Sequence, residues 1–127
     1  MDFDIEHELI TRFPSLFGFK GEVPEDASWG IECGAGWSAL IRAVCLALEH
    51  REKETGRAIR FNYIRQKMGV LQCTLTGFDD FTRGAVDVAH WMSYMTCELC
   101  GSNGSVARDS QGWVRVLCSS CRAASSG

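Results

Sequence analysis

The sequence predicts an α+β fold in which helices pack on a small β-hairpin and a C-terminal zinc-ribbon or knuckle lobe follows. Three features support this: helical apolar spacing from Trp37, alternating residues on both sides of Lys67, and two Cys-x-x-Cys pairs near the C-terminus. We expect an α+β body over residues 1–96, a rigidly attached structural zinc lobe over 97–122 and a frayed tail over 123–127.

The composition is that of an ordinary globular protein, with 46% hydrophobic and 23% charged residues in a chain of 127. This length fits one domain, or one domain with a small zinc appendage. The formal net charge of −3 argues against a general polyanion binder. Residues 1–32 are rich in acids and residues 51–67 in bases. These segments form either solvated faces or an acidic patch for a basic partner.

The N-terminal stretch has neither a basic region nor a long apolar run, which argues against a secretory signal. The sequence holds no stretch of 18 apolar residues, so we expect no membrane span. Of the seven cysteines, we assign four to zinc and three to free thiols. Free thiols fit a reducing compartment, because disulfides form and persist in oxidising ones. We therefore expect a cytoplasmic protein.

The body divides into helices and one hairpin. Residues 3–13 form a short amphipathic helix, which Pro14 ends. Residues 14–31 read as a loop whose aromatic side chains fold back onto the body. The clearest helical pattern begins at Trp37 and predicts a central core helix over 37–54.

Residues 58–66 and 70–76 alternate in polarity and predict a β-hairpin with a glycine at its turn. In the first strand, the alternation places Ile59, Phe61 and Tyr63 on one side and Ile64 on the other. A second long helix opens at Asp79 or Asp80 and runs into the first cysteine pair without a linker. The sequence favours a core position for three of the four tryptophans, namely Trp29, Trp37 and Trp91.

The two cysteine pairs predict one structural zinc site formed by Cys97, Cys100, Cys118 and Cys121. Seventeen residues separate the pairs, which lies within the spacing typical of a four-cysteine zinc site. The intervening segment can form a small hairpin around Asp109–Gly112, which has turn chemistry. Two disulfides or four ordinary buried cysteines are the alternatives, and disulfides would need an oxidising compartment, for which the sequence shows no export signal.

Three motifs carry a resemblance to a family of small bacterial and phage-borne proteins, mostly of unknown function. They are Glu32-Cys33-Gly34-Ala35-Gly36-Trp37, Lys67-Met68-Gly69-Val70-Leu71 and the Cys97–Gly101 knuckle. The chain departs from the family pattern at Ala35, where Asp is frequent, and at Met68, where an aromatic residue is frequent. The resemblance implies a bacterial or phage cytoplasmic setting and no defined reaction.

The sequence does not favour an enzyme. A catalytic zinc keeps an open coordination position, whereas four thiolates close the site. The best nucleophile is Cys33, because a thiol before a helix can have a lowered pKa. The other reading of Cys33 is a small buried residue in a tight turn. We interpret His7, His50 and His90 as surface or packed residues, although His90 is an alternative metal ligand.

We expect the protein to act by non-catalytic binding to another protein, with Trp113, Arg108, Arg115 and Arg122 of the zinc lobe as contact residues. The resemblance to phage-borne proteins implies that such a binding protein inhibits a host machine or a defence complex. The alternative is a nucleic-acid-binding zinc module or transcription regulator, since the same residues form a basic-aromatic face. The sequence leaves the partner's identity and the oligomeric state open.

Overall fold

Within residues 1–125, which the computed structural model describes, four α-helices, two 3₁₀ turns and two antiparallel hairpins follow one another. This confirms the α+β class. In chain order, the elements are α1 (Phe3–Arg12), η1 (Pro14–Phe17), η2 (Ala35–Trp37), α2 (Ser38–Thr55), β1 (Arg60–Lys67), β2 (Val70–Thr76), α3 (Asp80–Ser93), β3 (Ser105–Arg108), β4 (Val114–Leu117) and α4 (Ser119–Ser125).

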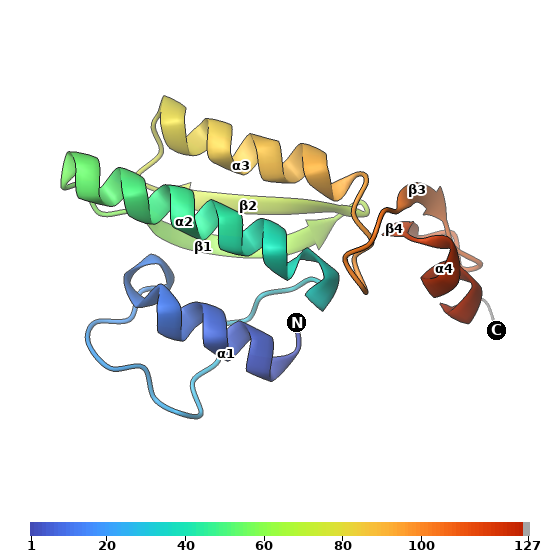
Figure 1. Cartoon of the computed structure of the whole chain (residues 1–127), viewed down its shortest axis with the longest axis horizontal. Coiled ribbons are helices and arrows are strands. Elements are labelled where there is room, and N and C mark those ends of the chain that lie inside the picture. Colours follow the sequence, from blue (N-terminus) through green and yellow to red (C-terminus); the bar gives the residue numbers. More distant parts are fainter. Residues whose placement is uncertain (126–127) are drawn as a thin grey trace.

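Helices α2 and α3 lie side by side along the β1–β2 hairpin and run in opposite directions, while α1 lies beyond α2 (Figure 1). The strands β3 and β4 and helix α4 form a lobe at one end of this body. Trp37 at the start of α2 is fully buried, and Leu9 of α1 and Leu71 of β2 belong to the same core. The prediction of a central core helix is confirmed, with bounds shifted by one residue at each end.

The β1–β2 hairpin has an irregularity that the alternating pattern did not predict. Its register shifts between Phe61 and Tyr63, so both Phe61 and Ile64 point into the core. A bulge of this kind inserts one residue and reverses the alternation beyond it. The predicted placement of Ile64 on the side opposite Phe61 was therefore wrong. Met68 and Gly69 both have positive φ, 52° and 88°, as a two-residue type I′ turn requires.

The segment between α1 and α2 is held on the body by the buried carboxylate of Glu6. This side chain is 5% exposed and accepts hydrogen bonds from the backbone N–H groups of Trp29, Gly30 and Ile31. The ring of Phe17 packs edge-on against Trp29, with centroids 5.1 Å apart. The expectation that the aromatic residues of this loop fold back onto the body is confirmed.

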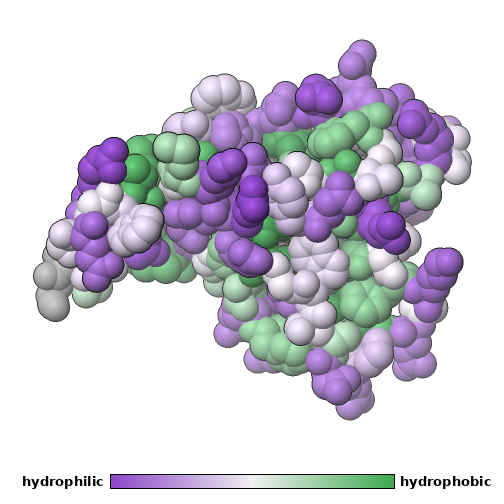
Figure 2. All heavy atoms as spheres, turned by 180° about the vertical axis from the view of Figure 1, so that it is seen from behind, coloured by the Kyte–Doolittle hydropathy of each residue, from purple (hydrophilic) through white to green (hydrophobic). Residues whose placement is uncertain are grey.

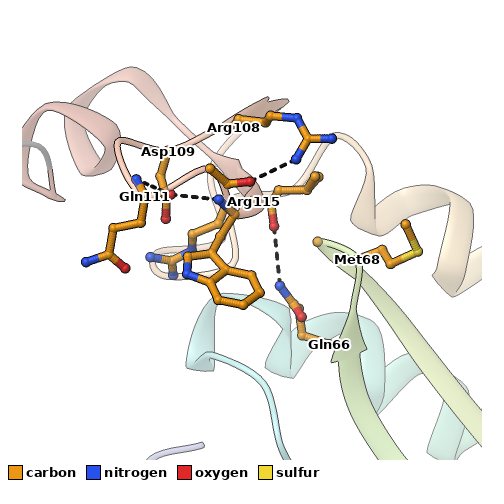
Figure 3. A pocket seen from close by; sticks show the side chains of 10 residues that line it. Gln66, Met68, Arg108, Asp109, Gln111 and Arg115 are labelled. Atoms are coloured by element: carbon orange, nitrogen blue, oxygen red, sulfur yellow. Dashed lines mark hydrogen bonds between the residues drawn. The ribbon is translucent and has the colours of Figure 1, made fainter.

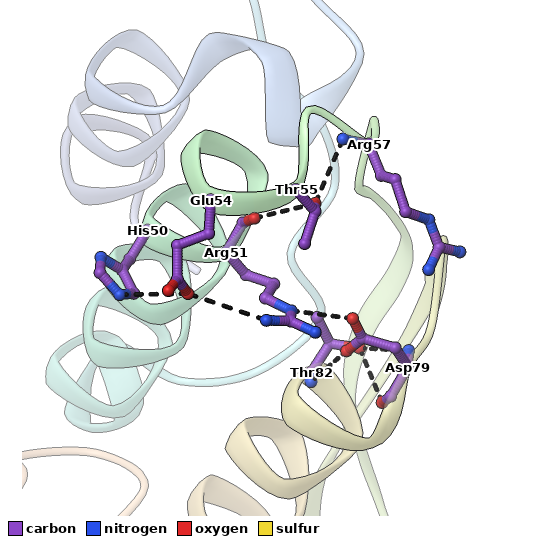
Figure 4. A network of polar contacts seen from close by, with 7 residues as sticks. All are labelled: His50, Arg51, Glu54, Thr55, Arg57, Asp79 and Thr82. Atoms are coloured by element: carbon purple, nitrogen blue, oxygen red, sulfur yellow. Dashed lines mark hydrogen bonds and ion pairs between the residues drawn. The ribbon is translucent and has the colours of Figure 1, made fainter.

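Helix α3 begins with a capping box at Asp79. The Asp79 carboxylate accepts a hydrogen bond from the Thr82 N–H, and the Thr82 hydroxyl accepts one from the Asp79 N–H. Arg51 of α2 donates from Nε to the same carboxylate at 2.9 Å (Figure 4). The hydrogen bond from the Thr82 backbone, followed by that from Arg51, lowers the pKa of Asp79 to about 2.

Asp79→Asn should destabilise the fold at neutral pH, and the difference from wild type should shrink as the pH falls from about 4 towards 2. The folded-state pKa lies below the unfolded value near 3.9, so the stabilisation is complete above about 4 and disappears as the native carboxylate is protonated. Urea unfolding of both proteins at several pH values measures this difference. A constant difference across this range would contradict the assignment.

Two predictions about the C-terminal half were wrong. Trp91 is 62% exposed on α3 and is not a core residue, because the face that α3 turns inward carries Thr82, Val86, Ala89 and Ser93 instead. The predicted frayed tail begins too early, since residues 123–125 complete α4. Residues 126–127 of that tail lie outside the described residues.

The lobe projects from the body, and both hydrophobic and hydrophilic side chains reach its surface (Figure 2). In the part of the chain that the structure describes, no helix combines the length and apolar character needed to span a bilayer.

Candidate metal centre

Four cysteine sulfurs converge between the two knuckles of the lobe. The Sγ atoms of Cys97, Cys100, Cys118 and Cys121 all lie within 4.8 Å of one another. The Sγ atoms of Cys100 and Cys118 are 3.7 Å apart. A tetrahedral zinc ion with bonds of about 2.3 Å sets its sulfur ligands about 3.8 Å apart, so the observed spacing fits such an ion. The four cysteines can therefore hold a metal ion.

The first knuckle is shaped by backbone hydrogen bonds around Cys97. The Cys97 N–H donates to the Ser102 carbonyl at 2.7 Å, and the Gly101 N–H donates to the Cys97 carbonyl at 2.9 Å. These bonds close a tight turn that carries Cys97 and Cys100 on the same side. The Glu98 N–H donates to the Val116 carbonyl at 2.9 Å, so the knuckle is also joined to β4, which leads to the second pair.

The second knuckle begins at the end of β4 and continues into α4. The Cys121 N–H donates to Sγ of Cys118 at 3.3 Å, and this bond is the main cause that lowers the pKa of Cys118 to about 6. A hydrogen bond of the Cys121 thiol to the Cys118 side chain favours the neutral thiol and raises the pKa of Cys121 to about 12. Once one of these closely packed thiols is ionised, its negative charge opposes the ionisation of the others. A bound cation would therefore stabilise the state in which all four thiols are deprotonated.

The Glu32–Trp37 turn forms the seat on which the first knuckle rests. The Gly36 N–H donates to the Glu98 carbonyl at 2.7 Å, and the Gly34 N–H donates to the Glu98 carboxylate at 2.9 Å. A Cβ at Gly36 would lie 2.2 Å from the Cys97 carbonyl oxygen, and one at Gly34 would lie 2.5 Å from that of Glu98. Only glycine permits this approach of the two backbones.

Trp37 adds a further contact between the body and the lobe. Its fully buried indole donates from Nε1 to the Thr96 carbonyl at 2.8 Å. Sequence reasoning identified the Glu32–Trp37 motif but did not connect it with the knuckle. Gly34 and Gly36 do not have the positive φ that favours glycine, so the close approach of the knuckle backbone is the reason for glycine at both positions.

The three remaining cysteines are buried in the body. Burial raises the pKa of Cys33 to about 12, with a smaller contribution from the charge of Glu98. Burial likewise raises the pKa of Cys73 to about 12 and raises that of Cys45. Cys33 is 7% exposed, which fits its reading as a small buried residue in a tight turn and not the reading as a thiol with a lowered pKa.

The histidines lie outside the cysteine cluster. His90 approaches the Leu71 carbonyl with Nδ1 at 2.8 Å, His7 approaches the Pro24 carbonyl with Nε2 at 2.9 Å, and His50 lies 3.3 Å from the Glu54 carboxylate. Their partners explain all three as packing or surface residues. Among the described residues, the metal-ligating group contains the four cysteines and not His90.

A groove of about 660 Å³ separates the tip of the β1–β2 hairpin from the turn of the lobe (Figure 3). We call it the Trp113 groove. Trp113 stands 67% exposed at its edge, and Asp109 holds the turn by accepting hydrogen bonds from the Gln111 and Trp113 N–H groups, both at 2.9 Å. The lining residues are Gln66, Met68, Gly69, Arg108, Asp109, Gln111, Gly112, Trp113, Val114 and Arg115.

The three arginines expected to contact a partner occupy different positions. Arg108 and Arg115 line the Trp113 groove. All three, Arg122 included, line a second hollow of about 450 Å³ beside α4. Arg108 donates to the Gly112 carbonyl and Arg122 to that of Ser105, both at 2.8 Å, so part of each guanidinium serves the lobe itself. Sequence reasoning missed Gln66 and Met68, which the fold brings to the same groove.

Comparisons with protein-family models, curated proteins and solved structures found no match. The interpretation of the site therefore rests on the residues of this chain.

Proposed function

We propose that this protein is a zinc-stapled, non-catalytic binding module that presents the Trp113 groove to another protein. The observation that carries the proposal is the convergence of four cysteine sulfurs in the lobe whose hairpin carries the exposed Trp113. A set of four thiolates in tetrahedral spacing favours zinc, and it leaves no open coordination position for catalysis. The metal's contribution is to hold the two knuckles together and thereby fix the turn that carries Trp113.

The groove has the composition of a protein-binding site. It combines an exposed indole, the guanidinium groups of Arg108 and Arg115, and the thioether of Met68, which is 79% exposed. Tryptophan, arginine and methionine are enriched at protein interfaces, where large side chains become desolvated around a few anchors. Gln66 of the β1–β2 hairpin donates to the Val114 carbonyl of the lobe at 3.5 Å across the groove. This hydrogen bond helps to hold the hairpin and the lobe in one relative position.

A reducing bacterial or phage cytoplasm is the setting we propose, from the free cysteines and from the resemblance to bacterial and phage-borne proteins. The proposal that the protein inhibits a host machine or a defence complex rests on that resemblance. A nucleic-acid partner is the second candidate, because Arg108 and Arg115 flank Trp113. Thiol catalysis by Cys33 is disfavoured, since burial opposes the thiolate form.

Trp113→Ala should weaken partner binding by about 2 kcal/mol or more, which is roughly a thirtyfold rise in Kd, because an anchor residue loses its contact area. Arg115→Ala should also weaken binding. The partner is first isolated from a bacterial lysate with the zinc-loaded protein, with and without nuclease, and its affinity is then measured for each variant. Phe3→Ala is the matched control, since Phe3 is an exposed aromatic residue on α1, 48% exposed, outside the groove.

Salt dependence separates the two partner classes. A nucleic-acid partner predicts recovery that nuclease abolishes and affinity that falls steeply with salt, because phosphate contacts release counterions. A protein partner predicts recovery that survives nuclease and weaker salt dependence. Wild-type affinity in Trp113→Ala together with a loss in Cys33→Ala, with zinc and fold intact, would contradict the binding-module proposal.

A further inference from the structure

Helix α3 turns its more hydrophobic side away from the body. The inward face includes Thr82 and Ser93, both fully buried, whereas large apolar side chains lie on the outer side. A helix that packed only on its own body would have the opposite distribution. The exposed residues share one side of the helix and of the turn after it, since Phe81, Val88 and Met92 are spaced by seven and four residues and Trp91 and Met95 by four. Their exposed fractions are 42% for Phe81, 60% for Val88, 62% for Trp91, 46% for Met92 and 60% for Met95.

This outer side of α3 borders an apolar groove between α3 and α2. The groove has a volume of about 480 Å³, and its lining contains no charged residue. On the α2 side, the lining side chains at the surface are all small: Ala39, Ala43 and Ala47. We call the groove together with the apolar edge of α3 the helix-pair face. It consists of a ridge of large side chains beside a trough of small ones.

The register of the two helices follows from their contacts. The end of α2 lies beside the start of α3, where Arg51 bonds Asp79 at 2.9 Å and the rings of His50 and Phe81 are 6.4 Å apart. Because the helices are antiparallel and rise equally per residue, Ala43 lies near the level of Val88. By the same count, Ala39 lies near the level of Met92 and Ala47 near that of Gly84, whereas Phe81 lies near the level of His50.

We propose that the helix-pair face binds the same face of a second copy of this chain. A two-fold axis parallel to the helices would set α3 of each copy over α2 of the other and preserve the levels along the axis. Two large side chains of the ridge then meet small ones of the trough, Val88 opposite Ala43 and Met92 opposite Ala39. Ala47 lies opposite Gly84, and Phe81 lies opposite His50.

The charges beside the face fit this arrangement. Asp87 of α3 is exposed and lies near the level of Arg42 of α2, whose guanidinium also bonds the Glu8 carboxylate of its own chain at 2.7 Å. The proposed two-fold brings each Asp87 towards Arg42 of the second copy, so opposite charges meet on both edges of the interface. Opposite-charge contacts at a rim set the orientation of association more than they add affinity.

The size of the face indicates a weak dimer. From Phe81 to its end at Ser93, α3 rises about 18 Å, and Met95 extends the face into the following turn. Two helices side by side are roughly 20 Å wide. Two copies would bury roughly 1,000–1,200 Å² in total, which is near the lower limit for specific interfaces. We expect a dissociation constant of about 1–100 µM. The Trp113 groove lies on the lobe and stays free for another partner.

Sedimentation equilibrium of the full zinc-loaded protein from about 1 to 500 µM tests the dimer. Wild type should pass from monomer to dimer in this range. Val88→Glu should raise the dissociation constant on the order of 100-fold, because it buries an unpaired carboxylate in each half of the interface. Ala43→Trp should have a similar effect by filling the trough. Phe3→Glu places the same charge on exposed α1 and should leave the dimer intact.

Circular dichroism first establishes that each variant is folded, which both sites permit because Val88 and Ala43 are exposed. A wild-type chain that stays monomeric at 500 µM would overturn the proposal, as would a dimer that both substitutions leave unchanged. A monomeric chain that binds an amphipathic helical peptide in a Val88-dependent way would assign the face to another protein's helix and would equally overturn it.

Discussion

Gly36→Ala is expected to destabilise the protein by about 3 kcal/mol, with a fall in Tm of about 10 °C. The added Cβ would lie 2.2 Å from the Cys97 carbonyl oxygen and 2.6 Å from the carbonyl group of Glu98. These are backbone atoms of the knuckle, so no flexible side chain can move aside. Either the Glu32–Trp37 turn or the knuckle must shift, and the 2.7 Å hydrogen bond from the Gly36 N–H would be lost.

Gly84→Ala is the matched control for this prediction. Gly84 lies within α3, and a Cβ added there meets nothing within 4 Å. Alanine favours a helix over glycine by up to about 1 kcal/mol, so this variant should be slightly more stable than wild type. Urea unfolding of both variants at low micromolar concentration measures the contrast. Equal stabilities would show that the seat does not support the knuckle.

Cys118→Ser is expected to remove most of the metal affinity and to unfold the lobe while leaving the body folded. Structural zinc contributes on the order of 10 kcal/mol to small zinc modules, and the loss of one thiolate opens the tetrahedral set. The core of the body is built mainly from α1, α2, α3 and the β1–β2 hairpin; Val116 of β4 joins it from the lobe, but the four ligands do not. Amide hydrogen exchange should show protection lost over residues 97–121 and retained in α2.

Cys73→Ala tests whether this effect belongs to the ligands. Cys73 is a buried cysteine in β2 and lies outside the cluster. Its truncation should lower the stability of the body while the zinc content stays unchanged. Loss of exchange protection in α2 of the Cys118→Ser protein would place the body and the lobe in one cooperative unit.

The sequence predicted the elements well where local patterns determine them. The apolar spacing from Trp37 identified α2, and the chemistry of Asp109–Gly112 identified the turn between β3 and β4. The spacing of the cysteine pairs identified the metal-ligating group, since two tight turns and a short hairpin suffice to bring four thiols together. These features depend on contacts close in sequence.

Features that depend on distant contacts were missed. The docking of Gly36 on Cys97 joins segments about sixty residues apart, and no local pattern encodes it. Trp91 was placed in the core because hydrophobicity alone does not tell which apolar side of a helix faces the body. The bulge after Phe61 depends on the pairing with β2, which alternation in one strand cannot reveal.

The zinc content of the purified, folded protein tests the central claim most directly, because the seat, the lobe and the Trp113 groove all depend on one metal ion. Elemental analysis should find one zinc per chain of wild type. Titration of accessible thiols in the native protein should show Cys97, Cys100, Cys118 and Cys121 protected until a chelator is added. A folded protein with well under one equivalent of zinc and these four thiols freely reactive would contradict the account.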